Sequence, residues 1–306
     1  MKLRLGTRAS ALAAWQARWV ADRLARQGID VELVPITTAG DRQRTEPIGQ
    51  IGTQGVFTKE IQNELLAGRV DLAVHSLKDL ATVAVPGLAL VAVPERGPVA
   101  DVLVFRDTVV TTLNDLPPRA VVATGSPRRK AQLLHARPDL RIKDLRGNVE
   151  TRLAKLDAGR FDAVVLAEAG LRRLGLEARI GQVLPPAIML PAVGQGALAV
   201  EMRADDPRAR AVARAIDHAS THAAVAAERA MLAALQGGCL APVAAWARVE
   251  GETLRLDGRV MRLDGSERLD AASTGPIAEP ESLGRRVAAE LIEQGAAEFI
   301  REARAE

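Results

Sequence analysis

The stretch Val70–Asp79, VDLAVHSLKD, decides the fold class of this chain. Its first six residues predict a strand, with Val70, Leu72, Ala73 and Val74 as its apolar positions. Its last four residues place hydroxyl, cationic and acidic groups at the end of that strand. Continuous Val, Ala and Leu runs are typical of strands covered on both faces, so they predict an α/β fold with mainly parallel sheets. Further runs of this kind recur at Leu88–Val93, Val102–Phe105, Ala120–Thr124, Ala163–Leu166 and Ala197–Glu201.

Amphipathic segments separate the predicted strands. Ser10 precedes a helix with apolar residues on one stripe, and Lys59–Leu66 has the same pattern. Residues 38–56 are expected to form a polar, Gly-rich loop between them, and a loop of this length is typically functional or mobile. Two further strands are predicted in this part of the chain, at Lys2–Gly6 and Val31–Thr37.

The order of elements changes after Asp217. A long Ala-rich helix, Thr221–Leu235, leads into Gly237-Gly238-Cys239, and a closing helix is expected over Pro280–Ile300. Consecutive strands between two helices predict a small α+β unit with a three-stranded antiparallel sheet. Its strands are expected at Val243–Val249, Thr253–Met261 and Glu267–Ala272, with turns at Glu250-Gly251 and Asp264-Gly265.

The composition narrows the class of protein. The 306 residues are 48% hydrophobic and 26% charged, with a net charge of +3, which excludes wholesale disorder and a disulfide scaffold. No run approaches the length of a membrane span, and Met1–Arg4 lacks the apolar core of a signal peptide, so we expect a cytoplasmic protein. The single cysteine excludes an internal disulfide. His218 and His222 lie four apart without a third ligand, so no metal site is predicted.

Four predicted strand ends carry polar groups at the start of a helix. Arginine is unusual there, because a structural helix favours acidic residues in its first turn. Hydroxyls, backbone N–H groups and guanidinium groups in that position predict a cleft that binds several anions. A GC-rich or heat-adapted source would also explain the bias of 35 Arg to 6 Lys. The four segments are Thr7–Ser10, His75–Asp79, Thr124–Arg129 and Arg146–Arg152.

Residues 126–155 hold nine cations against three acids, a concentration that could also bind nucleic acid. No aromatic residue lies between positions 106 and 160, so stacking platforms for single strands are missing and a small polycarboxylate or phosphorylated ligand fits better. Asp79 is either a general acid/base or a helix-start carboxylate paired with Lys78. Cys239, between Gly238 and Leu240, is either a functional thiol or an inert filler.

Several motifs together closely resemble the porphobilinogen deaminase family over essentially the whole chain. They are RLGTRASALA, AVHSLKDL, TGSPRRKAQL, LRGNVETRLAKLDAG, LAEAGLRRLGL, LPAVGQGALAVE and ERAMLAALQGGCLAPV. The resemblance implies two lobes like those of periplasmic binding proteins and a third, cofactor-carrying domain. Two segments rich in Pro and Gly, Pro94–Pro98 and Leu184–Val193, are expected to cross between the lobes. The expected domains are 1–94 with about 195–216, 99–190 and 217–306.

The resemblance also implies the chemistry. Cys239 would hold a dipyrromethane cofactor through a thioether, and the enzyme, a transferase, would join four porphobilinogen molecules head to tail with loss of ammonia. Hydrolysis would then release hydroxymethylbilane. Asp79 matches the catalytic aspartate, whose carboxylate stabilises positive charge as ammonia leaves. The expected protein is a monomer that hands its product to uroporphyrinogen-III synthase and binds neither nucleic acid nor membrane.

The remaining matched residues would bind the carboxylates of the growing chain. We expect Arg128 and Arg129 to hold the first two rings and Arg173 to meet later rings. Two departures concern the loop, where Gln50 and Gln54 stand in place of Lys in many relatives, and a third is Gly125, which replaces a hydroxyl residue found in some. The full set is Arg8, Arg128, Arg129, Arg146, Arg152 and Arg173 as carboxylate forks, supported by Ser10, Ser76, Lys78, Thr124, Ser126 and Gln195.

Two alternative interpretations are an anion-binding receptor and a nucleic-acid-binding protein. Measurement of the intact mass distinguishes them from the enzyme, since only the enzyme should carry two covalently bound pyrrole units. We predict that Cys239→Ser folds but lacks this covalent adduct, because a hydroxyl in place of the thiol cannot form the thioether. A Cys239→Ser protein with the same mass increment and the same activity as the parent contradicts the prediction.

Overall fold

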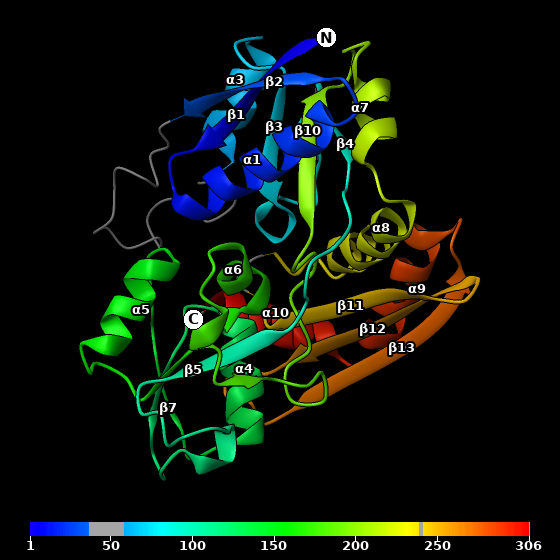
Figure 1. Cartoon of the computed structure of the whole chain (residues 1–306). Coiled ribbons are helices and arrows are strands. Elements are labelled where there is room, and N and C mark those ends of the chain that lie inside the picture. The colour runs from blue at the N-terminus through cyan, green and yellow to red at the C-terminus, as the bar shows by residue number, and fades with distance from the viewer. Residues whose placement is uncertain (37–57, 239–240, 306) are drawn as a thin grey trace. The chain divides into compact units, whose positions relative to one another are not determined.

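The computed structural model describes residues 1–36, 58–238 and 241–305. The chain divides into two compact units, Met1–Gly97 with Ala197–Ala223 and Pro98–Gly196 with Ala224–Glu306. Each unit is therefore built from two separate stretches of sequence (Figure 1). The three-domain boundaries expected from the sequence remain a prediction.

The first unit contains a five-stranded sheet in the order β2-β1-β3-β10-β4. Two helices, α1 and α7, cover one face, where Leu3 and Leu5 pack against Val20 and Val212. Helix α3 covers the other face, where Ile61 belongs to a second cluster of buried residues. The elements are β1 (Lys2–Arg8), α1 (Ala11–Ala25), β2 (Asp30–Ile36), α3 (Lys59–Leu66), β3 (Leu72–Ser76), the 3₁₀ helix Leu77–Asp79, β4 (Leu88–Ala92), β10 (Leu198–Arg203) and α7 (Ala209–Ile216).

The second unit contains a similar five-stranded sheet in the order β7-β6-β8-β5-β9. Alternate residues of its central strands enter two clusters, with Leu103 and Val165 in one and Val104 and Val164 in the other. Both faces of this sheet are therefore covered, as the apolar runs predict. The elements are β5 (Asp101–Phe105), the 3₁₀ helix Leu113–Asp115, β6 (Val121–Ala123), α4 (Pro127–Ala136), β7 (Arg141–Lys143), α5 (Val149–Asp157), β8 (Ala163–Ala167), α6 (Glu168–Arg173), the 3₁₀ helix Glu177–Arg179 and β9 (Gln182–Val183).

The predicted α/β class is confirmed, and both five-stranded sheets are mixed. Strand β1 is parallel to β2 and β3, whereas β10 is antiparallel to β3 and β4. In the second unit, β6 is parallel to β7 and β8, whereas β5 is antiparallel to β8 and β9. The strands β10 and β5 each follow a boundary between the two units, so no helix-containing crossover within one unit forces them to be parallel.

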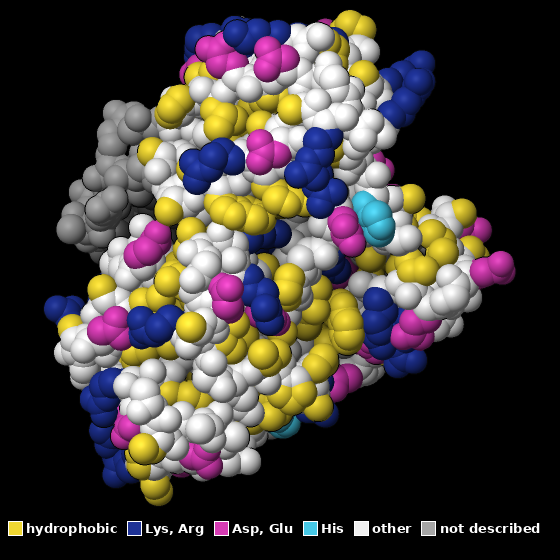
Figure 2. Space-filling model, viewed as in Figure 1, with side chains coloured by type: hydrophobic (Ala, Val, Ile, Leu, Met, Phe, Trp, Pro, Cys, Tyr) yellow, Lys and Arg dark blue, Asp and Glu magenta, His cyan; other side chains and the backbone are white. Residues whose placement is uncertain are grey.

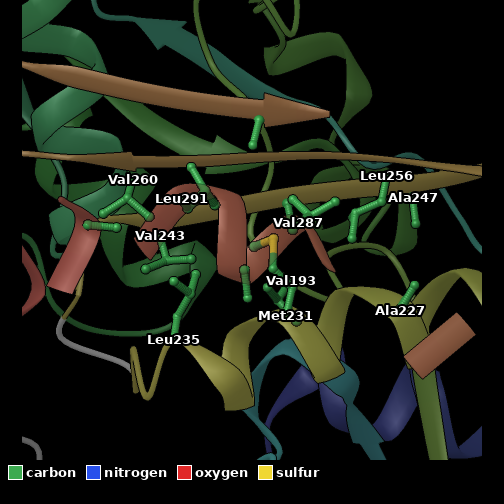
Figure 3. Packing of buried hydrophobic residues seen from close by; sticks show 14 of the residues in the cluster. Val193, Ala227, Met231, Leu235, Val243, Ala247, Leu256, Val260, Val287 and Leu291 are labelled. Atoms are coloured by element: carbon green, nitrogen blue, oxygen red, sulfur yellow. The ribbon is translucent and has the colours of Figure 1, made fainter. Parts of the chain in front are cut away.

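The predicted antiparallel sheet of three strands is present as β11-β12-β13. Gly251 and Gly265 adopt positive φ angles of 63° and 77° in its two turns, a conformation that favours glycine. Figure 3 shows Met231 of α8 beside Val193 and Val287, in the core beneath this sheet. The elements are α8 (Ala219–Ala234), β11 (Val243–Glu250), β12 (Thr253–Met261), β13 (Arg268–Pro276), α9 (Pro280–Glu293) and α10 (Ala296–Ala305).

The prediction of one closing helix over Pro280–Ile300 is wrong, because two helices, α9 and α10, occupy this region. Gly295 lies between them with a φ of 104°, a left-handed value that ends a right-handed helix. The short strands β7 and β9 were also not expected, since three and two residues give too little periodicity to read from a sequence.

Pairs of arginine and carboxylate recur across the protein, and the face drawn in Figure 2 shows basic side chains interspersed with acidic ones. One such network in the first unit surrounds Asp71, which is buried. Its carboxylate accepts hydrogen bonds from Arg4 Nε at 3.1 Å and Arg208 Nη2 at 2.9 Å. Burial alone would raise the pKa of Asp71, but the hydrogen bonds from Arg4 and Arg208 hold it well below its ordinary value.

We predict that Asp71→Asn lowers the free energy of unfolding by about 3 kcal/mol at pH 7, because the variant leaves partly buried arginines without their counter-charge. The difference from the parent should shrink as the pH falls below about 4, where Asp71 becomes protonated in the unfolded chain. Urea unfolding at several pH values measures both effects.

Glu64→Gln is the control for this experiment, since Glu64 pairs with Arg69 on the surface and its loss should change little. A difference between parent and Asp71→Asn that stays constant from pH 7 to pH 3 contradicts the role given to the Asp71 carboxylate.

Candidate functional site

The predicted site residues of the first unit lie at one edge of its sheet. Strands β1 and β3 are parallel neighbours, so the segments that follow them emerge at the same edge. Arg8 ends β1 and is half-buried, and Ser10 begins the next helix, where its hydroxyl accepts a hydrogen bond from the Ala13 amide at 3.4 Å. Ser10 is therefore also the cap that starts α1.

Ser76 ends β3, and Lys78 and Asp79 follow it on a turn whose backbone is held by neighbouring residues. The Leu77 amide donates to the Ala197 carbonyl at 3.0 Å, and the Leu77 side chain is buried. The Ser76 hydroxyl accepts a hydrogen bond from Gln16 Nε2 at 2.8 Å. Lys78 and Asp79 are exposed. The turn thus presents a cation and a carboxylate to solvent from a firmly held backbone.

A buried polar pair lies directly before this turn. His75 Nε2 is 3.0 Å from Glu201 Oε2, and Gln62 Nε2 donates to the same oxygen at 3.0 Å. Both members of the pair are within the sheet, on β3 and β10. Sequence reasoning did not identify Gln16, Gln62 or Glu201, because no local motif links residues that are 60 or more positions from their partners.

In the second unit, Thr124 and Ser126 shape the start of α4. The Ser126 amide donates to the Thr124 hydroxyl at 3.2 Å, and the Ser126 hydroxyl accepts from the Arg129 amide at 3.4 Å. Pro127 occupies the first position of the helix, as predicted. A Cβ atom on Gly125 would lie 2.8 Å from the Leu145 carbonyl oxygen, so a side chain at this departure from the family pattern would require the backbone to shift.

Arg128 and Arg129 are both buried, each 5% exposed, and both contact Asp101. Arg128 Nη1 donates to Asp101 Oδ2 and to the Leu190 carbonyl, each at 2.7 Å. Arg129 donates to Asp101 Oδ1 from Nε at 2.9 Å and to the Val165 carbonyl from Nη1 at 3.0 Å. Burial lowers the pKa of Arg128, as does the neighbouring Arg129 charge, while Asp101 opposes both effects.

The cations around the start of α5 are more accessible. Arg146 is exposed and pairs with Asp144 at 2.9 Å, and Arg152 is half-buried with its Nε donating to the Gly147 carbonyl at 2.8 Å. Asn148 caps the helix by accepting a hydrogen bond from the Thr151 amide at 2.8 Å. Arg146 can therefore reorient toward a ligand without leaving a buried carboxylate behind, because Asp144 is itself exposed.

Gln195 lies in the segment before β10, and Arg173 contacts the same segment. Arg173 Nη2 donates to the Gly196 carbonyl at 2.6 Å, and burial lowers the pKa of Arg173 to about 10. Gln195 is buried and donates from Nε2 to the Val99 carbonyl at 2.7 Å and to Asp101 Oδ1 at 3.1 Å. The structure therefore joins Gln195 to Arg128 and Arg129 through Asp101.

The predicted residues thus form one set at the sheet edge of the first unit and another in the second unit. Cys239, Gln50 and Gln54 lie outside the described residues. Within the described part of the chain, no group of three His, Cys, Asp or Glu side chains could hold a metal ion. Its helices also include none that is long and apolar enough to cross a bilayer. Asp101, which meets both buried arginines, was not predicted.

Comparisons with known proteins agree with the motifs. The sequence profile of the "Porphobilinogen deaminase, dipyromethane cofactor binding domain" matches residues 3–211, and that of the "Porphobilinogen deaminase, C-terminal domain" matches residues 222–293. Porphobilinogen deaminase from Moorella thermoacetica is 47% identical over 100% of this chain and 98% of its own length. The enzyme of the same name from Pelobacter propionicus is 44% identical over 98% of this chain and 97% of its own length.

Solved structures with a similar backbone include the methionine binding protein MetQ, at 15% identity and a TM-score of 0.46, covering 70% of this chain and 89% of MetQ. A periplasmic substrate-binding protein of an ABC transporter from Coxiella burnetii has 17% identity and a TM-score of 0.45, covering 70% of this chain and 91% of its own.

The arginines of the two groups should differ in their effect on stability. We predict that Arg129→Ala lowers the free energy of unfolding by about 3 kcal/mol, because it removes several hydrogen bonds of the buried Asp101 cluster. Arg146→Ala should change it by less than about 0.5 kcal/mol, because Arg146 is exposed. Urea unfolding of the two variants measures the difference, and equal losses contradict the division into buried and exposed arginines.

Proposed function

This chain belongs to the porphobilinogen deaminase family, and we propose that its two sets of polar residues carry out hydroxymethylbilane synthesis. Each of four additions forms a carbon–carbon bond between a pyrrole α-carbon and the aminomethyl carbon of porphobilinogen, and each releases ammonia. Water then releases the linear product. When bound, the dipyrromethane supplies the free α-carbon that receives the first unit.

The observation that carries this proposal is the exposed carboxylate of Asp79 on a fixed turn. The Leu77–Ala197 hydrogen bond holds the backbone of the turn, so the main chain that carries the carboxylate has a defined position at the edge of the sheet. A carboxylate there can accept a hydrogen bond from a pyrrole N–H and stabilise positive charge as ammonia leaves. It can also receive the proton lost from the α-carbon after the new bond forms.

Lys78 and Arg8 supply positive charge near Asp79. Both follow or end neighbouring parallel strands, β3 and β1, and so lie at the same edge of the sheet as Asp79. Each pyrrole ring carries two carboxylates, which such cations can bind. The combination of one carboxylate with surrounding cations suits a substrate that is anionic at its periphery and cationic at its reacting centre.

The donor chemistry of the second unit fits the dipyrromethane. Its propionate and acetate groups require cationic donors in a partly dry site, and Arg128, Arg129 and Arg173 are such donors. The buried cluster of two guanidinium groups and one carboxylate carries a net positive charge, which a cofactor carboxylate would neutralise. Attachment through Cys239 is supported by its place in the matched Gly-Gly-Cys motif.

The substrate, oligomeric state, location and product transfer that we propose follow from the family resemblance. Porphobilinogen is the substrate. A monomeric state, a cytoplasmic location, a division into three domains and transfer of the product to uroporphyrinogen-III synthase are further parts of the proposal. The resemblance over the whole chain supports them.

We predict that Asp79→Asn retains the covalent cofactor but lowers the turnover rate by about a hundredfold to ten-thousandfold, the usual range for losing a general acid or base. The amide has the same shape as the carboxylate but can neither balance a cation nor accept its proton. Intact mass measures cofactor loading, and release of ammonia from porphobilinogen measures turnover.

The control is Asp22→Asn, since Asp22 is exposed on α1 of the same unit. It should load and turn over as the parent does. If Asp79→Asn carries the cofactor and works within about threefold of the parent rate, Asp79 has no such role.

A further inference from the structure

Asp101 connects three of the residues expected to bind carboxylates. It is fully buried at the start of β5. Besides the hydrogen bonds from Arg128 Nη1 and Arg129 Nε, its carboxylate is 2.7 Å from Arg129 Nη2 and 3.1 Å from Gln195 Nε2. Neither the family motifs nor the charge pattern predicts a role for Asp101, because it lies outside the motifs and follows a loop without a cluster of charges.

The two arginines use their nitrogen atoms differently. All three guanidinium nitrogens of Arg129 contact protein acceptors, on Asp101 and on the Val165 carbonyl. Arg128 makes its hydrogen bonds through Nη1 alone, and its Nε and Nη2 atoms have no hydrogen-bond partner among the described residues. The Nε–Nη2 edge is one of the two edges through which a guanidinium binds a carboxylate with two parallel hydrogen bonds.

The Leu190 carbonyl, which is the second acceptor for Arg128 Nη1, is itself held in place. Gln132 Nε2 donates to it at 3.1 Å, and the Leu190 amide donates to Gln132 Oε1 at 2.8 Å. Arg259 Nη1 donates to the same Gln132 oxygen at 3.0 Å. At the other end of α4, His135 Nδ1 is 2.8 Å from the Gly265 carbonyl oxygen. Arg128 is thus oriented by two acceptors whose own positions are fixed.

The charges of the cluster do not cancel. Among the described residues, the hydrogen bonds given above join two buried guanidinium groups to one carboxylate, and a buried excess charge is costly unless a further group compensates it. A ligand carboxylate on the Nε–Nη2 edge of Arg128 would supply the missing negative charge. This places the ligand at an edge whose direction Asp101 determines.

We propose that Asp101 is a positioning residue: it orients Arg128, with Arg129 and Gln195, so that the Nε–Nη2 edge of Arg128 receives a carboxylate of the pyrrole cofactor or chain. The proposal rests on the proposed function, because the ligand class comes from there. Asp101 contacts no ligand and acts through the arginines.

Removing the Asp101 charge distinguishes a positioning role from simple electrostatic attraction of the ligand, because the two predict opposite changes in ligand binding. Asp101→Asn raises the net charge of the cluster by one, so attraction alone predicts tighter binding of an anionic ligand. Positioning predicts weaker binding, because the amide keeps one acceptor oxygen but places an NH2 donor against one of the two guanidinium groups, which loses its alignment. A misplacement of about 1 Å can cost about a hundredfold.

The experiment titrates folded apoprotein with porphobilinogen and follows the two-pyrrole mass increment. For Asp101→Asn we expect the half-loading concentration to rise by about tenfold or more. The matched control is Asp162→Asn, which removes a carboxylate of the same unit that accepts from Arg106 Nη2 and the Val121 amide. It should load at the parent concentration. Thermal unfolding of each apoprotein separates lost stability from altered loading.

An unchanged or lower half-loading concentration in folded Asp101→Asn overturns the inference, whatever its thermal midpoint. If Asp101→Asn does not fold, the comparison moves to Arg129→Gln with and without Asp101→Asn, since the double variant has the same net cluster charge as the parent. The double variant should then load about fivefold less readily than Arg129→Gln. Equal or easier loading overturns the inference. If the parent itself gains no two-pyrrole increment, the proposed function fails and the inference fails with it.

Discussion

The fold of the second unit depends on two guanidinium groups that hydrogen-bond to one fully buried carboxylate, that of Asp101. Removing charged groups from water costs several kcal/mol per ion, and close pairing with good hydrogen bonds is needed to offset that cost. Asp101 meets this requirement from the first residue of a central strand, while Arg128 and Arg129 approach from the first turn of α4. The register of β5, the start of α4 and the segment around Gln195 are therefore fixed relative to one another.

In the first unit, the carboxylate expected to act in catalysis, that of Asp79, is exposed to solvent rather than buried. Asp79 lies on a short 3₁₀ helix whose fixed points are the buried Leu77 side chain, the Leu77–Ala197 hydrogen bond and the Gln16–Ser76 hydrogen bond. Packing and hydrogen bonds hold the main chain of the turn, so Asp79 needs no ion pair with a protein cation to keep its backbone in place. A group that is positioned through its neighbours remains available for a substrate.

Sequence patterns predicted most of the helices and strands because both units contain clear helix caps and apolar strand patterns. The Ser10 cap, the Lys59–Leu66 helix, Pro127 at the first position of α4 and the three C-terminal strands all rest on local chemistry. The pairing direction of β5 and β10 depends on where distant segments return, which no local pattern encodes. The role of Asp101 could not be predicted for the same reason, since its partners Arg128, Arg129 and Gln195 lie 27, 28 and 94 positions away. The break at Gly295 was missed because one glycine within an apolar periodicity is a weak signal.

The arginine clusters around Asp71 and Asp101 differ in their exposure to solvent, and this difference supports the proposal that a ligand binds at the cluster around Asp101. Around Asp71, the side chains of Arg4 and Arg208 are 43% and 32% exposed, so water screens charge that the carboxylates do not neutralise. Around Asp101, the two arginine side chains are 5% and 7% exposed, and no such screening is available. An excess of positive charge is tolerated at the first cluster by solvent. At the second, the buried excess charge supports the proposal that a ligand carboxylate binds there. A permanently attached polycarboxylate would neutralise that charge more reliably than a substrate that binds and dissociates.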